Sequence, residues 1–505
     1  MAGAFALRVL CPAILLPVVQ AAAGSQSACL SSSACELPVS SEEGALHLLQ
    51  AHSAPQLRLP VSAANASSKA LLELARTLGW TQQVIASGSG DGDDVPECVI
   101  QGDGDCPLSS FDYNVLNKVL PRGETACLNG ARNYFFQFVK RDTQKLVLLF
   151  QSGGVCHSKE AYDSSLCDTE PHMQMLDGLL DGTQAENPYN QYSLVVVTSC
   201  SGDLHSGHAE QPWGTAGARV KQRGYENTQA VLQWTANQFP ELTSLTVLGL
   251  STGAYALQWW ASYILDTLTQ SRTRTVVCAD SFIGVTYPTS DSRAVDAYLM
   301  ELWKMCGTHV IKHRGMRHRC SHGRLTFSEV WNHAMRRHRR ATFAHINSKS
   351  DLTQIRYADA VAAVVGNTAT MTKQQYYFAV NKRLEDWGRN RNYRSYLVDG
   401  EHHNYLDRRY AYTATPHGKL GSADDRPTLL DWTRDLLSRR RQTPRHVCMG
   451  SKMRVGRRIS TSSSVVYCDK KLYCSRNWRY WGKAGKKKLA PTPCRDDDCE
   501  PGGSN

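Results

Sequence analysis

The chain has 505 residues, enough for about two or three domains, and its 42% hydrophobic and 20% charged residues are typical of a globular protein. This composition excludes an intrinsically disordered chain. The formal net charge of +11 indicates attraction to anionic surfaces such as acidic polysaccharides or phospholipid headgroups, and it carries no information about the fold.

Residues 1–24 have the pattern of a secretory signal peptide. Arg8 precedes the apolar run VLCPAILLPVVQ, and the small residues AAAG follow that run. Later residues contain no apolar segment long enough to span a membrane. We therefore expect a soluble, secreted protein in the extracellular space, where nucleic acid is not an expected partner.

Cysteine content supports the same compartment. The chain has 17 cysteines, of which Cys11 lies in the signal peptide, and the remaining sixteen suit several disulfides in an oxidising environment. Zinc is the alternative, but no Cys-x-x-Cys pair with suitable histidine spacing is present, so we expect no metal. Asn65 begins the sequon Asn-Ala-Ser and is a candidate glycosylation site.

Composition divides the mature chain into three parts. Residues 25–110 are rich in Ser, Ala, Gly and Asp and predict a cysteine-containing extension that ends in a linker; residues 111–440 predict the catalytic domain. Residues 441–505 predict a basic, cysteine-rich appendage with the run GKAGKKKLA. This tail either contacts a polyanion or is a solvated extension braced by disulfides. We favour the second interpretation, because charge runs are usually only solvated surface.

The central part alternates apolar runs with amphipathic segments. The runs are KLVLLF (145–150), SLVVVTSC (193–200), LTVLGL (245–250), RTVVCAD (274–280) and ATFAHIN (341–347). Such near-continuous apolar runs are typical of parallel strands that are buried on both faces, and the segments between them have helical spacing. The pattern predicts an α/β fold with a mostly parallel sheet flanked by helices, and functional loops at the carboxyl ends of the strands.

One of these strands ends in the pentapeptide GLSTG (249–253). Gly-x-Ser-x-Gly between a strand and a helix is the pattern of a nucleophile elbow, in which small residues allow a tight turn that exposes the serine hydroxyl. The alternative is an ordinary serine in a glycine-rich loop. The flanking predictions of strand and helix fit Ser251 as a nucleophile, but the pentapeptide and its context alone leave both interpretations open.

A nucleophilic serine requires an acid and a base, which follow it in this order in the chain. Asp351 comes just after an apolar run, and His402 and His403 follow the short run SYLVDG. Asp280 also ends a strand and competes with Asp351 for the role of the acid. The histidines of HRGMRHRCSHG (313–323) are better explained by a solvated, disulfide-tied insertion than by a metal site.

The loop after the first run, QSGGVC, supplies candidate donors for an oxyanion. Gly153 and Gly154 follow a strand directly and expose backbone N–H groups, although the pair is also compatible with a simple turn. Cys156 and Cys167 are placed to clamp the continuation of this loop by a disulfide.

With these segments in order, residues 125–410 resemble the family of pectin acetylesterases and Notum carboxylesterases, which are secreted serine esterases of α/β-hydrolase type. The blocks that carry the resemblance are CLNGARNYFFQFVKRDTQKLVLLFQSGGVC, VVVTSCSGDLHSG, RGYENTQAVLQW, LTVLGLSTGAYA, INSKSDLTQI and YLVDGEHHNYL.

The resemblance implies a role for each matching residue. It implies that Ser251, Asp351 and His403 are the catalytic triad, with His403 preferred over His402 because it stands three residues after Gly400. It also implies two further groups of residues. The backbone N–H groups of Gly153, Gly154 and Thr252 form the oxyanion hole, and Asp203, His205, Asp280 and Gln354 shape the site.

The chain departs from the family pattern near the site. Ser152 replaces the first glycine of the loop, Val155 replaces a bulky aromatic residue, Thr252 replaces a small residue, and Tyr255 stands where a second glycine is frequent. These substitutions leave the backbone N–H donors of the oxyanion hole in place. They leave the identity of the substrate open.

We therefore expect a secreted serine carboxylic-ester hydrolase without a cofactor, which removes acetyl groups from a polysaccharide or another anionic glycan. The alternatives are a deacylase of a lipidated protein, a peptidase with the same triad, and an inactive hydrolase scaffold that binds a glycan or polyanion.

Overall fold

The computed structural model describes residues 95–102, 104–286, 292–367, 369–421, 427–438 and 446–447. The predicted signal peptide, the predicted glycosylation site at Asn65 and nearly all of the predicted appendage at 441–505 lie outside the described residues. None of the helices in the described ranges has the length and apolar character that a membrane crossing requires.

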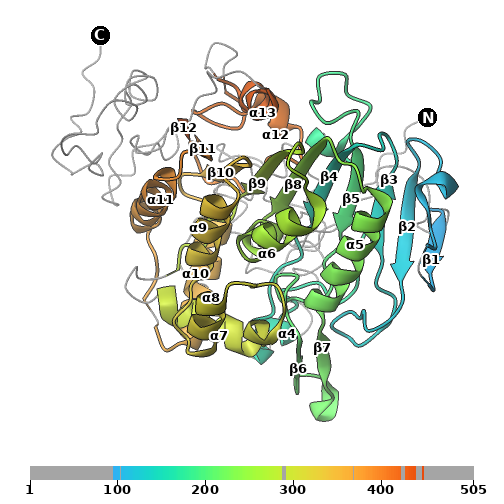
Figure 1. Ribbon diagram of the computed structural model, residues 1–505. Helices are drawn as coiled ribbons and strands as arrows, with labels where there is room; N and C mark the ends of the chain where they lie inside the picture. The colour runs from blue at the N-terminus through green and yellow to red at the C-terminus, as the bar shows by residue number, and fades with distance from the viewer. Residues whose placement is uncertain are drawn as a thin grey trace, which may run out of the picture. The chain divides into compact units, whose positions relative to one another are not determined.

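Ten strands form one sheet in the order β1-β2-β3-β5-β4-β8-β9-β10-β11-β12 (Figure 1). From β5 to β12 every neighbouring pair is parallel, and only β3 runs antiparallel to both of its neighbours. The strands are β1 (Glu97–Ile100), β2 (Leu116–Pro121), β3 (Phe136–Val139), β4 (Lys145–Phe150), β5 (Ser193–Val197), β8 (Ser244–Leu250), β9 (Arg274–Asp280), β10 (Thr342–Ser348), β11 (Tyr393–Val398) and β12 (His446–Val447). A separate hairpin joins β6 (Ala209–Gln211) to β7 (Val220–Gln222).

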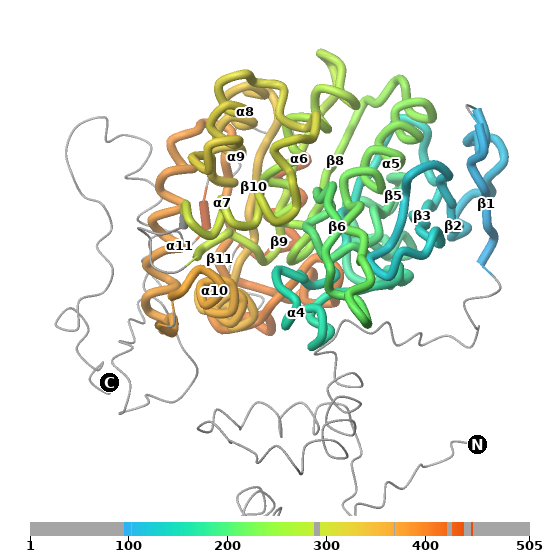
Figure 2. Tube along the Cα trace, turned by 90° about the horizontal axis from the view of Figure 1, so that it is seen from below, coloured from blue at the N-terminus to red at the C-terminus, as the bar shows by residue number. Residues whose placement is uncertain are grey.

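Helices flank this sheet. In Figure 1, α5 and α6 lie in front of the strands, and Figure 2 shows α10 across the strands from α8 and α9. The helices are α4 (Lys159–Asp163), α5 (Gly224–Gln238), α6 (Thr252–Leu268), α7 (Ser292–Leu302), α8 (Arg314–Ser321), α9 (Phe327–Arg337), α10 (Leu352–Val364), α11 (Lys373–Gly388), α12 (Tyr410–Thr413) and α13 (Leu429–Leu437). The prediction of a mostly parallel sheet flanked by helices is confirmed.

The five predicted apolar runs all lie on central strands, because β4, β5, β8, β9 and β10 are covered on both faces and almost every residue in them is buried. Strands toward the two edges of the sheet were not predicted. β2 alternates half-buried and buried residues, so it contains no continuous apolar run. β1 lies within the stretch expected to be extension and linker, and β12 lies within the expected appendage.

Disulfides join cysteines that are close in sequence or lie on neighbouring loops. The described residues contain the disulfides Cys98–Cys106, Cys127–Cys200, Cys156–Cys167 and Cys306–Cys320. The predicted clamp on the loop after β4 is therefore present. Cys278 on β9 is buried as a free thiol.

The turn between β8 and α6 is tight and strained. Ser251 has φ 53° and ψ −114°, a backbone conformation that costs about 1–3 kcal/mol in a residue other than glycine. The turn requires glycine at positions 249 and 253, because a side chain at either position would collide with the backbone. A Cβ on Gly249 would lie 2.5 Å from the carbonyl oxygen of Gly253, and a Cβ on Gly253 would lie 2.1 Å from the carbonyl oxygen of Phe150. The elbow therefore packs directly against the end of β4.

Gly253→Ala should destabilise the protein, because the new methyl group meets backbone that cannot move without shifting β4. We expect the free energy of unfolding to fall by about 1–3 kcal/mol, measured by urea denaturation. Gly307→Ala is the matched control, since no atom lies within 4 Å of its Cβ position. Equal stability of the two variants would contradict the close contact between the elbow and β4.

Candidate active site

The sheet brings Ser251, His403 and Asp351 together from three loops at the carboxyl ends of β8, β11 and β10. His403 Nε2 lies 2.7 Å from Ser251 Oγ, and His403 Nδ1 lies 2.7 Å from Asp351 Oδ2. An ionised carboxylate can only accept a hydrogen bond, so Nδ1 carries the proton and Nε2 accepts from the serine hydroxyl. This is the hydrogen-bond chain that activates a serine nucleophile.

Asp351 raises the pKa of His403. Burial alone would lower the pKa of His403, but the neighbouring Asp351 carboxylate and its hydrogen bond outweigh burial and raise that pKa above its usual value. A base with a raised pKa accepts the serine proton more readily.

Gln354 holds the acid in place. Asp351 is fully buried at the N-terminus of α10; its Oδ1 accepts from the Gln354 N–H at 3.0 Å, and its Oδ2 accepts from Gln354 Nε2 at 2.9 Å. The other end of the Gln354 amide accepts from the Ile283 N–H at 2.9 Å. Gln354 thus joins the acid to the loop after β9 and fixes the orientation of the carboxylate.

Asp280, the other candidate for the acid, makes different contacts. Asp280 is fully buried, and its Oδ2 accepts from the N–H groups of Tyr405 and Leu406, both at 2.7 Å. Burial raises the pKa of Asp280 to about 7. Asp280 thus holds the segment that follows His403 and makes no hydrogen bond to that imidazole.

His402, the other candidate for the base, packs against aromatic rings. The His402 ring packs edge-on against Tyr405 and Tyr410, with ring centroids 5.2 and 4.6 Å apart. Burial lowers the pKa of His402 to about 3, so this imidazole is neutral at physiological pH. It is placed to pack rather than to accept a proton from Ser251.

The loop after β4 lies against the elbow. Within the described residues, neither the Gly154 N–H nor the Thr252 N–H donates a hydrogen bond, so both are available to an oxyanion. The Gly153 N–H donates instead to Thr252 Oγ1 at 3.2 Å. The hydroxyl of Thr252, the residue after Ser251, therefore occupies the Gly153 N–H, one of the three expected oxyanion donors. An alanine at this position could not make this contact.

His205 supports this loop, and Asp203 supports the segment between β5 and α5. His205 Nε2 lies 2.8 Å from the Gln151 carbonyl oxygen, and burial lowers the pKa of His205 to about 4, so a neutral ring donates to that carbonyl. Asp203 accepts from Ser201 Oγ at 2.7 Å and from the Gly224 N–H at 2.8 Å, where α5 begins. Both side chains position backbone and make no contact with the triad.

Two residues near the site were not among the predicted site residues, although Tyr255 was noted above as a departure from the family pattern. Tyr255, one turn after Ser251, donates from its hydroxyl to Asp296 Oδ1 at 3.1 Å and stacks on Phe282 with ring centroids 4.5 Å apart. Asp168 follows the closing cysteine of the clamp, and its N–H donates to the Gly153 carbonyl oxygen at 2.8 Å.

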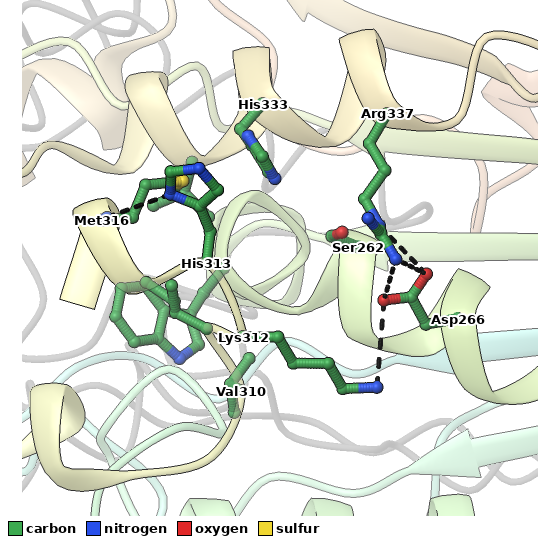
Figure 3. Close-up of a pocket in the computed structure, with 11 residues that line it drawn as sticks. Ser262, Asp266, Val310, Lys312, His313, Met316, His333 and Arg337 are labelled. Atoms are coloured by element: carbon green, nitrogen blue, oxygen red, sulfur yellow. Dashed lines mark hydrogen bonds and ion pairs between the residues drawn. The ribbon is translucent and has the colours of Figure 1, made fainter.

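A cavity of about 150 Å³ lies along the second half of α6, away from Ser251 (Figure 3). In it Asp266 is paired with Arg337 at 3.0 Å and with Lys312 at 3.8 Å. His313 belongs to the histidine-rich segment, which forms α8 and is tied by Cys306–Cys320. Within the described ranges, no group of three or more side chains is arranged to hold a metal ion.

Comparison with known proteins places the chain in a family. Among the solved structures, the Wnt deacylase Notum from Drosophila matches at 16% identity with a TM-score of 0.44, over 62% of this chain and 89% of that one. No curated protein matches the chain. The model of the pectinacetylesterase family matches residues 110–393, which is more than half of the chain and includes Ser251 and Asp351; His403 lies beyond the end of the match. The chain therefore belongs to the pectinacetylesterase family.

Proposed function

We propose that the protein is a secreted serine esterase that removes acetyl groups from a polysaccharide, with Ser251 as nucleophile, His403 as general base and Asp351 as the orienting acid. The observation that carries this proposal is the continuous hydrogen-bond chain from Ser251 through His403 to the buried Asp351 carboxylate. Membership of an esterase family supports the same reaction class.

The mechanism follows from the positions of these groups. His403 Nε2 takes the proton of Ser251 as Oγ attacks the ester carbonyl, and the N–H groups of Gly154 and Thr252 stabilise the oxyanion. His403 then gives the proton to the leaving alcohol, which leaves an acyl group on Ser251. Water, deprotonated by His403, attacks this acyl-enzyme and releases the acid.

The surroundings of the elbow favour a short acyl group. The Tyr255 ring is buried, is fixed by Asp296 and lies between Phe282 and Phe327, with both ring centroids 4.5 Å away. Rigid aromatic rings therefore fill the volume beside the first turn of α6. The net charge of +11 favours an anionic polymer as the carrier of the acetyl ester.

Hydrolysis of p-nitrophenyl esters tests this proposal with the full chain. We expect turnover of p-nitrophenyl acetate, with kcat/KM at least about tenfold higher than for p-nitrophenyl octanoate. Absence of turnover of p-nitrophenyl acetate would refute the esterase proposal. A preference for p-nitrophenyl octanoate would refute the proposal that the acyl group is short. Release of acetate from acetylated pectin identifies the polymer.

Asp351→Asn should lower kcat for p-nitrophenyl acetate by about 10⁴-fold, because an amide in place of the carboxylate favours the wrong tautomer of His403. Asp280→Asn should mainly lower the urea midpoint, since Asp280 binds backbone N–H groups rather than the imidazole. A greater loss of kcat in Asp280→Asn than in Asp351→Asn would reverse the assignment of the acid.

A further inference from the structure

The cavity beside the second half of α6 is separate from the reacting atoms (Figure 3). Helix α6 begins directly after Ser251, and a rise of about 1.5 Å per residue puts Asp266 roughly 20 Å further along its axis. Buried Trp259, Met316 and Val330 give the cavity an apolar lining. Its volume of about 150 Å³ has room for a ligand part of one six-membered ring.

Cationic side chains outnumber the acids in this cavity. Among the described residues that line it, Asp266 is the one acid, and it faces both Arg337 and Lys312. Arg337 holds the carboxylate through Nε and Nη2, whereas Lys312 Nζ lies 3.8 Å away, too far for a hydrogen bond. Figure 3 shows the two cationic side chains approaching Asp266 from different sides. The Lys312 ammonium group thus makes no hydrogen bond within the described part of the chain.

Two histidines line the same cavity. The rings of His313 and His333 have centroids 5.1 Å apart, and His333 makes no hydrogen bond to a described residue. Burial lowers the pKa of His333, and the neighbouring His313 and Arg337 lower it further. The opposing effect of Asp266 is smaller than either. The electrostatic potential at this ring is therefore positive, which favours an anionic ligand.

Exposed arginines continue this positive charge onto the surface. Residues 312–340 contain nine lysines and arginines and one acid, Glu329. Arg317 lies one turn after His313, which caps α8, and Arg336 lies one turn after His333 on α9. Both arginines are exposed, and neither forms an ion pair with a described residue. This segment therefore carries a large share of the net charge of +11.

We propose that this cavity is an anchoring site for an acidic polysaccharide, in which one sugar ring packs on Trp259 and Met316 and its carboxylate pairs with Lys312. A carboxylate only accepts hydrogen bonds, and the groups without a partner here are donors. They are the Lys312 ammonium and the buried Nε1–H of Trp259, which has no acceptor among the described residues. The inference rests on the proposed deacetylation of a polysaccharide and narrows that polysaccharide to one with charged sugars.

Calorimetric titration of the full chain with trigalacturonate at low salt tests this inference, with the neutral trisaccharide maltotriose as reference. We expect trigalacturonate to bind about tenfold more tightly than maltotriose, and Lys312→Met to lower its affinity about three- to tenfold. Lys382→Met is the matched control, because Lys382 is an exposed lysine on α11 that does not line the cavity. It should keep the affinity of wild type.

Asp266→Asn should change the affinity in the opposite direction. It removes the charge that competes for Lys312 and leaves an amide oxygen that can still accept from Arg337. We expect trigalacturonate to bind about threefold more tightly to this variant, a gain that a purely structural role of Asp266 does not produce. Circular dichroism spectra identical to that of wild type show that both variants are folded.

Equal affinities of wild type, Lys312→Met and Asp266→Asn for trigalacturonate would place the ligand elsewhere on the chain and overturn the inference. Equal affinities of wild type for trigalacturonate and maltotriose would also overturn it. Turnover of p-nitrophenyl acetate is measured on the same preparations. Turnover without binding at the cavity removes this inference alone, whereas binding at the cavity without turnover refutes the proposed esterase and leaves the anchoring site in place.

Discussion

Ser251→Ala is expected to lower kcat for p-nitrophenyl acetate on the order of 10⁶-fold, the largest effect of any single substitution in this chain. The hydroxyl lies 2.7 Å from His403 Nε2, on a strained turn that the chain maintains at a cost in stability. Removing Oγ removes the atom that forms the acyl-enzyme. The fold should persist, because the change takes away one atom and fills no new space.

Ser262→Ala is the control for this prediction. Ser262 lies on α6, the helix that begins directly after Ser251, and its hydroxyl is 3.2 Å from His338 Nε2 at the cavity of Figure 3. We expect its kcat to equal that of wild type, with identical circular dichroism spectra for all three proteins. Turnover by Ser251→Ala close to that of Ser262→Ala would exclude Ser251 as the nucleophile.

His403→Ala is expected to lower kcat by nearly the same factor, because without a base the hydroxyl of Ser251 is a weak nucleophile. The double variant Ser251→Ala/His403→Ala should be no slower than either single variant, since the two groups act as one unit. Initial rates with p-nitrophenyl acetate measure both effects.

His402→Ala is the control for His403→Ala. The two histidines are adjacent in sequence, but their rings make different contacts. Its ring packs on Tyr405 and Tyr410, so we expect lower stability and a change in kcat of less than about tenfold. A loss as large as that of His403→Ala would make His402 the base.

Local patterns in the sequence marked Ser251 and a short set of candidates for the other two positions. The choice of Asp351 over Asp280 and of His403 over His402 came from the family resemblance. The strand-turn-helix context marks the elbow, and each of the other two follows an apolar run. Parallel strands carry such loops to one edge of the sheet, so order along the chain was enough to bring the three residues together.

Other features depend on contacts that no local pattern records. The antiparallel strand β3 has only four residues, and its neighbour β2 alternates half-buried and buried residues, so neither contains a long apolar run. The hydrogen bond from Gly153 to Thr252 joins residues 99 positions apart.

Labelling with a fluorophosphonate tests most directly whether Ser251 is the nucleophile. We predict that loss of p-nitrophenyl acetate turnover follows the fraction of protein labelled, that peptide mass spectrometry places the label on Ser251, and that His403→Ala resists labelling. A label on any other residue, or full turnover by protein labelled at Ser251, would contradict the triad.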